Sequence, residues 1–232
     1  EQKEVSVMSV HLMVRSAYTL LKSSLRVEDI VNEAVRQGYD AVALSDYEVM
    51  HGAMAFYHAC QKQGIKGIYG MEVHCVLSPG EQAVFVVLAR NDEGFLQLMK
   101  LSTRLQTQKE ELTIEELAAY AADCIVITSG AEDVLYALLV REDEAGLRRY
   151  LQQLQRTFTR NDSRFLAQRN QLLRKAADEM GITRVALAII CYRSAADEEA
   201  YRVLCAIDQG LQVDDKTLKT ASGRWFRSKA EM

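Results

Sequence analysis

The sequence predicts an α/β fold with a mainly parallel sheet. Short apolar runs alternate along the chain with longer amphipathic stretches, which is the pattern of repeated strand–helix units. Roughly six or seven such units fit a barrel, in which functional groups lie at the carboxyl ends of the strands. The 232 residues, of which 49% are hydrophobic and 26% charged, supply enough apolar material for a substantial core.

The first half of the chain contains four predicted strands and three predicted helices. The first helix places Ile30, Val31, Ala34 and Val35 on one apolar face and ends at Gly38. The sequence "SPGE" predicts a hairpin or a sharp return between two strands. The predicted strands are 5–10, 41–46, 67–77 and 83–90, and the predicted helices are 27–38, 54–64 and 91–106.

The second half is richer in predicted helices. Thr113 and Glu116 form a Thr-x-x-Glu pattern, which predicts a capping box at the start of a helix. The predicted helices are 113–121, 131–140, 143–157, 170–181 and 196–210, and the predicted strands are 124–130 and 184–190.

Composition excludes several classes of protein. The net charge of −4 and the pI of about 5.7 argue against DNA binding through a basic surface. The chain shows no apolar run of about 18 residues and no signal-peptide pattern, so we expect a cytoplasmic protein without a membrane anchor. The five cysteines are widely spaced, which is typical of reduced, buried thiols.

Polar side chains at the predicted strand ends are the candidate site. They are Arg15, Asp46, Glu72 or His74, Ser129 and Cys191. No phosphate-binding glycine loop and no serine nucleophile elbow is present. The turn at Ser129 either binds an anion at a helix N-terminus or is an ordinary capped turn.

The histidines leave a metal site open as a second possibility. They are His11, His51, His58 and His74. Glu72 and His74 share one face of a predicted strand, because strand side chains alternate. Two potential ligands two residues apart fit a metal site but do not establish one.

Three separated blocks carry a family resemblance. They are "VHLMVRSAYTLL", "AVALSDYEVMHGAMAFYHACQKQGIKGIYGMEV" and "VALAIICYRSAADEEAYRVLCAIDQG". These blocks resemble the PHP (polymerase and histidinol phosphatase) domain of the bacterial DNA polymerase III alpha subunit. The ending "GRWFRSKAEM" resembles the passage in which that domain leads to the polymerase palm and thumb. The resemblance implies a distorted TIM-like (β/α)7 barrel over residues 1–212 and an exit segment over 213–232.

The same resemblance implies which positions would bind metal in active members, where up to three ions support phosphoester hydrolysis. The HxH positions fall on Met13 and Arg15, and the DxH positions fall on Ile189 and Cys191. In the Asp-His pair, Asp46 is kept but Tyr47 replaces the histidine; the strand-end glutamate is kept as Glu72. The strand and histidine expected near 158–170 are not recognisable.

These replacements predict a site that has lost its metal. Arg carries a fixed positive charge, Met is a soft ligand and Ile cannot bind a metal. Two carboxylates without a cation would be costly to bury. We therefore expect Arg15 to pair with Asp46 and Glu72 in place of the metal, with no catalytic residue and no cofactor in this domain.

The leading interpretation is a non-catalytic, structural domain of a replicative DNA polymerase. The resemblance implies that its partners are the remainder of the alpha subunit and, in some members, a proofreading exonuclease, with DNA contacted by the parent polymerase. One alternative is an active phosphoesterase that binds Mn, Zn or Fe through Asp46, Glu72, His74 and His51. A second alternative is a free-standing regulatory barrel, which the gene sequence beyond Met232 would distinguish.

Overall fold

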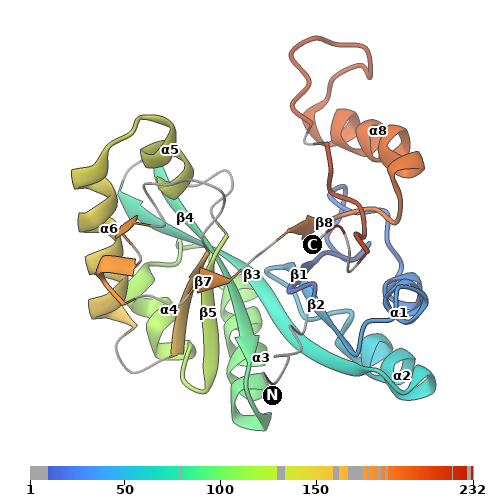
Figure 1. Cartoon of the computed structure of the whole chain (residues 1–232), viewed down its shortest axis with the longest axis horizontal. Helices are drawn as coiled ribbons and strands as arrows, with labels where there is room; N and C mark the ends of the chain where they lie inside the picture. The colour runs from blue at the N-terminus through green and yellow to red at the C-terminus, as the bar shows by residue number, and fades with distance from the viewer. Residues whose placement is uncertain are drawn as a thin grey trace, which may run out of the picture. The chain divides into compact units, whose positions relative to one another are not determined.

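The computed structural model describes residues 10–78, 80–129, 134–158, 162–166, 175–176, 178–181, 184–185, 188–220, 222–228 and 231, which form an α/β fold as predicted. The strands are β1 (Met13–Val14), β2 (Ala41–Tyr47), β3 (Lys66–Ser78), β4 (Glu81–Ala89), β5 (Cys124–Thr128), β6 (Asp162–Leu166), β7 (Arg184–Val185) and β8 (Ile189–Ile190). The helices are α1 (Val27–Arg36), α2 (Ala53–Gln63), α3 (Asp92–Thr107), α4 (Ile114–Tyr120), α5 (Val134–Val140), α6 (Glu144–Thr157), the short 3₁₀ helix η1 (Ala195–Asp197) and α8 (Glu198–Gln209) (Figure 1).

The chain divides into two compact units. The first unit comprises Glu1–Leu44, His51–Ile68 and Ala188–Met232, and the second comprises Ser45–Met50 and Tyr69–Leu187. The first unit therefore joins the two ends of the chain. The predicted division into residues 1–212 and 213–232 places its boundary inside this unit and stays a prediction.

The first unit is built around a short parallel pair, β1 and β8, with α1 packed beside α2 (Figure 1). Ile30, Val31 and Ala34 of α1 are fully buried, whereas Val35 is 41% exposed. The prediction that all four share the buried face was therefore wrong for Val35. The helix turns by about 100° per residue, so a fourth position falls at the edge of the apolar stripe.

The larger of the two described sheets is mixed. The strand order of the six-stranded sheet is β2-β3-β4-β5-β6-β7. The β3–β4 and β4–β5 pairs are antiparallel, whereas β5–β6 and β6–β7 are parallel. The antiparallel β3–β4 pair confirms the hairpin predicted at SPGE, whereas the expectation of a mainly parallel sheet was wrong for the β4–β5 pair. The predicted tight turn, in which Gly80 has a φ of 84°, forces β3 and β4 to run in opposite directions.

The two faces of β3 have different roles. Met71, Val73 and Cys75 are buried in the apolar core of the second unit, together with Phe85 and Val87 of β4. Helices α3, α4 and α6 contribute leucines to the same core. Glu72 and His74 alternate with the core residues along the strand and therefore lie on the opposite face of the sheet.

Several predicted strands differ from the structure. The predicted strand 184–190 is two short strands in different sheets, because β7 pairs with β6 and β8 pairs with β1. Strand β6 was not predicted, although it pairs with β5. Residues 5–9 of the first predicted strand lie outside the described residues. The described strands form an open sheet and a separate pair, so the closed barrel stays a prediction.

Most helix ends follow the predicted signals. The Asn91 side chain accepts a hydrogen bond from the Gly94 N–H and caps α3, and Gly64 ends α2 with a φ of 67°. The Thr113 hydroxyl accepts from the Glu116 N–H, but the Glu116 carboxylate binds Arg104 instead of completing the capping box. None of the helices in the described part of the chain is long and apolar enough to cross a bilayer.

Candidate functional site

The β1–β8 pair brings together four of the lost ligand positions. Met13 pairs with Ile189 and Val14 with Ile190, and the Arg15 N–H donates to the Ile190 carbonyl oxygen at 3.0 Å. Arg15 directly follows β1 and Cys191 directly follows β8. Because the two strands are parallel, both residues lie at the carboxyl end of the pair. The first HxH position thus lies beside the first DxH position, although they are far apart in the sequence.

Ser23 ties these two strand ends together. Its hydroxyl lies 2.7 Å from the carbonyl oxygen of Arg15 and 2.8 Å from that of Cys191, and it accepts from the Leu25 N–H at 3.2 Å. Ser23 is 5% exposed. The sequence did not identify this residue, because a serine in a polar turn gives no signal of such a contact.

The second unit holds the retained carboxylates. Asp46 lies near the end of β2 and Glu72 lies in the middle of β3, and each is 1% exposed. Glu72 was predicted at a strand end, but β3 continues beyond it into the hairpin with β4. The His74 Nε2 atom lies 3.3 Å from Oε1 of Glu72, and the Tyr47 ring packs edge-on against the imidazole at 4.8 Å.

Glu48 is a further member of this cluster that the sequence did not identify. Its φ of 55° is in the left-handed region, and its N–H donates to the Glu72 carbonyl oxygen at 2.9 Å. Burial raises the pKa of the Glu48 carboxyl, and the charge and backbone N–H of His74 partly oppose that shift. A strained backbone and a partly desolvated carboxyl often coincide at functional sites.

The remaining predicted residues lie outside these clusters. His51 is exposed and packs against the Tyr18 ring at 6.4 Å, and His58 is exposed beside Tyr57. Ser129 is buried, and its N–H donates to the Val84 carbonyl oxygen, while the adjoining residues 130–133 lie outside the described residues. His11 is buried, and its Nε2 atom lies 2.9 Å from the Arg227 carbonyl oxygen.

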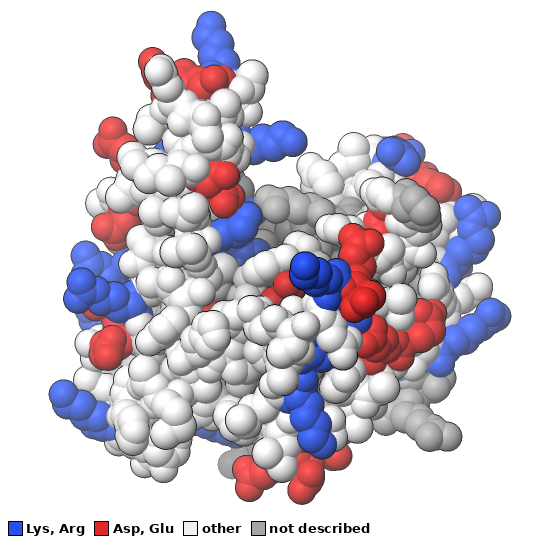
Figure 2. Space-filling model, turned by 180° about the vertical axis from the view of Figure 1, so that it is seen from behind, with Lys and Arg blue, Asp and Glu red and all other residues white. Residues whose placement is uncertain are grey.

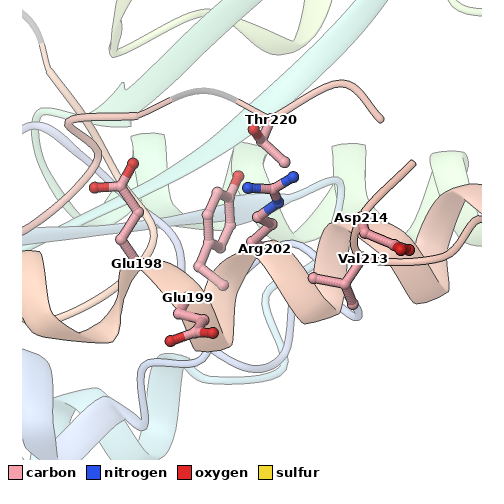
Figure 3. A pocket seen from close by; sticks show the side chains of 7 residues that line it. Glu198, Glu199, Arg202, Val213, Asp214 and Thr220 are labelled. Carbon is pink, nitrogen blue, oxygen red and sulfur yellow. The ribbon is translucent and has the colours of Figure 1, made fainter. Parts of the chain in front are cut away.

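A pocket of about 580 Å³ lies between α8 and the segment that follows it. Figure 3 shows Arg202 pointing toward Thr220, with Glu198, Glu199 and Asp214 around them. All of its lining residues belong to the first unit, and none is a predicted ligand position. The pocket therefore shares no lining residue with the candidate site.

The residues at the predicted ligand positions do not fit a multi-metal centre. Met13 offers only a soft thioether, Ile189 has no donor atom and Arg15 carries a fixed positive charge. Among the described residues, no group of three or more His, Cys, Asp or Glu side chains is arranged to hold a metal ion. Arg15 belongs to the first unit and the carboxylates to the second, so their ion pair stays a prediction.

Sequence comparison finds relatives of this chain among the alpha subunits of bacterial DNA polymerase III. A segment of DNA polymerase III subunit alpha from Bacillus subtilis (strain 168) is 36% identical over 220 residues, covering 89% of this chain and 19% of that protein. The corresponding subunit of Halalkalibacterium halodurans is 32% identical over 235 residues, covering 97% of this chain and 21% of that protein. The chain thus spans about a fifth of the length of these relatives.

Solved structures with a similar fold have distant sequences. An amidohydrolase from Chromobacterium violaceum, solved with sulfate and no metal, has a TM-score of 0.56 at 10% identity, covering 79% of this chain and 87% of that one. A candidate metal-dependent phosphoesterase from Bifidobacterium adolescentis has a TM-score of 0.54 at 10% identity, covering 78% and 87%. At this identity the likeness concerns the fold alone. The family model of the PHP domain matches residues 11–166, and the chain therefore belongs to the PHP domain family.

Proposed function

We propose that this chain is the PHP domain of a replicative DNA polymerase III alpha subunit, and that it supports the polymerase structurally without catalysing a reaction. The observation that carries the proposal is the β1–β8 edge, where Met13, Arg15, Ile189 and Cys191 replace the ligands that the family resemblance implies. The relatives from Bacillus subtilis and Halalkalibacterium halodurans support the polymerase assignment.

The partner in this proposal is the remainder of the alpha subunit, in the cytoplasm. On the face shown in Figure 2, Lys and Arg side chains are interspersed with Asp and Glu, without an extended basic surface. Together with the net charge of −4, this agrees with a domain that leaves DNA binding to the rest of the polymerase. Sequencing the gene beyond Met232 tests the assignment: we expect a polymerase palm, whereas a stop codon would indicate a free-standing barrel.

The proposal includes a distorted (β/α)7 barrel in which Arg15 replaces the metal charge beside Asp46 and Glu72. The burial of all three side chains supports it, since Arg15 is 7% exposed and each carboxylate 1%. Buried charges need partners, and removing one partner of a buried pair typically destabilises a protein by about 3–5 kcal/mol.

A double-mutant cycle tests this ion pair. Arg15→Met removes the charge while keeping side-chain length, and Glu72→Gln removes the opposite charge. We expect each single variant to be destabilised and the double variant to be more stable than the sum predicts, by about 1 kcal/mol or more. Asp46→Asn provides the second arm. Additive effects in both arms would contradict the charge replacement.

The proposal extends to a proofreading exonuclease as a second partner. The family resemblance supports this step, and a binding titration of a purified exonuclease subunit against the chain would test it. Saturable binding is the expected result, and no change in signal at high micromolar concentration would remove the exonuclease from the proposal.

One contact favours a second candidate function. His74 Nε2 lies 3.3 Å from Glu72 Oε1. Two of the four residues that would bind metal in the phosphoesterase alternative are therefore neighbours. A working phosphoesterase would hydrolyse a phosphoester in the presence of added Mn, Zn or Fe, and His74→Ala would abolish that activity. We expect no metal-stimulated hydrolysis by the unmodified chain.

A further inference from the structure

Residues 222–228, called the strap here, continue the β1–β8 sheet by backbone hydrogen bonds. The Cys191 and Tyr192 N–H groups both donate to the Arg224 carbonyl oxygen, at 2.9 and 3.3 Å. Trp225 forms a parallel bridge with Tyr192, and the Phe226 N–H donates to the Tyr192 carbonyl oxygen at 3.2 Å. The strap therefore occupies the position of a third strand beside the end of β8.

Side chains from the N-terminal part of the sequence, His11 and Tyr39, contact the strap. Phe226 is 2% exposed and packs edge-on against His11, with 4.6 Å between the ring centroids, and also against Tyr39. The Arg227 carbonyl oxygen accepts from His11 Nε2 at 2.9 Å and from the Tyr39 hydroxyl at 2.7 Å. His11 and Arg227 are 216 positions apart in the sequence. This contact therefore joins a segment near the N-terminus to a segment near the C-terminus within the first unit.

The arginine at the start of the strap adds a third fixed point. The Arg224 N–H donates to the Tyr192 hydroxyl at 3.1 Å, and the Arg224 guanidinium donates to the Tyr201 hydroxyl on α8 at 3.2 Å. Tyr192 and Tyr201 are themselves buried in one apolar cluster with Cys191 and Cys205. The strap is thus bound to β8, to α8 and to the segment that precedes β1.

We infer that the strap is a structural part of the first unit and acts as a rigid joint, which keeps residues 222–228 in one orientation relative to β8 and α8. A flexible linker would be exposed and make few contacts. The strap instead contains a buried aromatic ring and a carbonyl oxygen that accepts two side-chain donors. That such a joint would orient a polymerase palm rests on the proposed function, whereas the joint itself does not.

Amide hydrogen exchange of the full chain tests the strap. We expect the Phe226 and Cys191 amides to exchange as slowly as the Arg15 amide of the β1–β8 ladder. Phe226→Ala should accelerate their exchange about tenfold or more, because it removes the buried ring. Val213→Ala, in the exposed segment before the strap, is the matched control and should leave both rates unchanged.

If the Phe226→Ala variant does not fold, a milder variant and a distance measurement test the strap in its place. Tyr39→Phe removes one donor to Arg227 without a cavity and should accelerate Phe226 exchange by a smaller factor. Spin labels at Met54→Cys and Ser222→Cys, both exposed positions, should give a narrow distance distribution. Exchange of residues 222–228 at the rate of an unstructured peptide, or a broad distance distribution, would overturn the inference while leaving the polymerase proposal intact.

Discussion

Lowering the pH should weaken the fold through His11. This side chain is 1% exposed, and its Nε2 atom faces the Arg227 carbonyl oxygen, which can only accept. The proton of the neutral ring therefore lies on Nε2, and Nδ1 is buried with no hydrogen-bond partner among the described residues. Burial lowers the pKa of His11, and the nearby Arg227 charge lowers it further, while the contact with the Arg227 carbonyl opposes both.

The size of the effect follows from proton binding by the unfolded state. As the pH falls through about 6.5, an unfolded His11 gains a proton that the folded chain does not. Its stabilising contribution is thus complete above this pH and is lost as the pH falls toward the lowered value. Between about pH 7.5 and 5.5 the loss is at most about 1.4 kcal/mol, the limit for a folded ring that stays neutral throughout.

Urea denaturation at several pH values measures this loss. His11→Gln is the matched variant, because glutamine keeps an N–H donor for the Arg227 carbonyl oxygen and cannot titrate in this range. The difference in unfolding free energy between the two proteins should shrink by about 1 kcal/mol as the pH falls, since other groups titrate equally in both. Parallel pH profiles would refute the assigned burial of a neutral His11.

Two further predictions concern the second unit and the thiols. A Cβ at Gly94 would overlap the Asp123 carbonyl oxygen, so Gly94→Ala should destabilise the chain by about 1–3 kcal/mol in thermal or urea unfolding. The control Lys100→Ala, at an exposed position of the same helix, should change stability by less than about 0.5 kcal/mol. Equal effects of the two substitutions would contradict the packing of α3. Burial raises the pKa of Cys60 and Cys124 to about 11, and all five cysteines are buried thiols outside any disulfide. Ellman's reagent at about pH 8 should therefore react at least about 100-fold faster in denaturant than with the native chain, and a rapidly modified native thiol would contradict this.

Local signals in the sequence predicted much of the fold. Gly64 and Asn91 mark helix ends through chemistry that acts within a few residues, and the turn before Gly80 fixes the β3–β4 hairpin. Strands defined by distant partners were harder. The run 184–190 looks continuous by composition, but its two ends belong to different sheets, and β6, with the sequence DSRFL, lacks the apolar alternation of a half-buried strand.

The candidate site was predictable only in part. The resemblance assigned Met13, Arg15, Ile189 and Cys191 to ligand positions, and the β1–β8 register brings these positions side by side. Ser23 and Glu48 could not be predicted in the same way. Their roles depend on backbone groups supplied by distant strands, which residue type alone does not reveal.

The metal content of the purified chain tests the central claim most directly. The protein should be isolated without a chelator, and its Mn, Fe and Zn content measured by mass spectrometry relative to protein concentration. If Met13, Arg15, Ile189 and Cys191 have replaced the metal ligands, each metal will be far below one equivalent per chain. One or more equivalents of any of these metals, retained through dialysis, would contradict the account and favour the phosphoesterase.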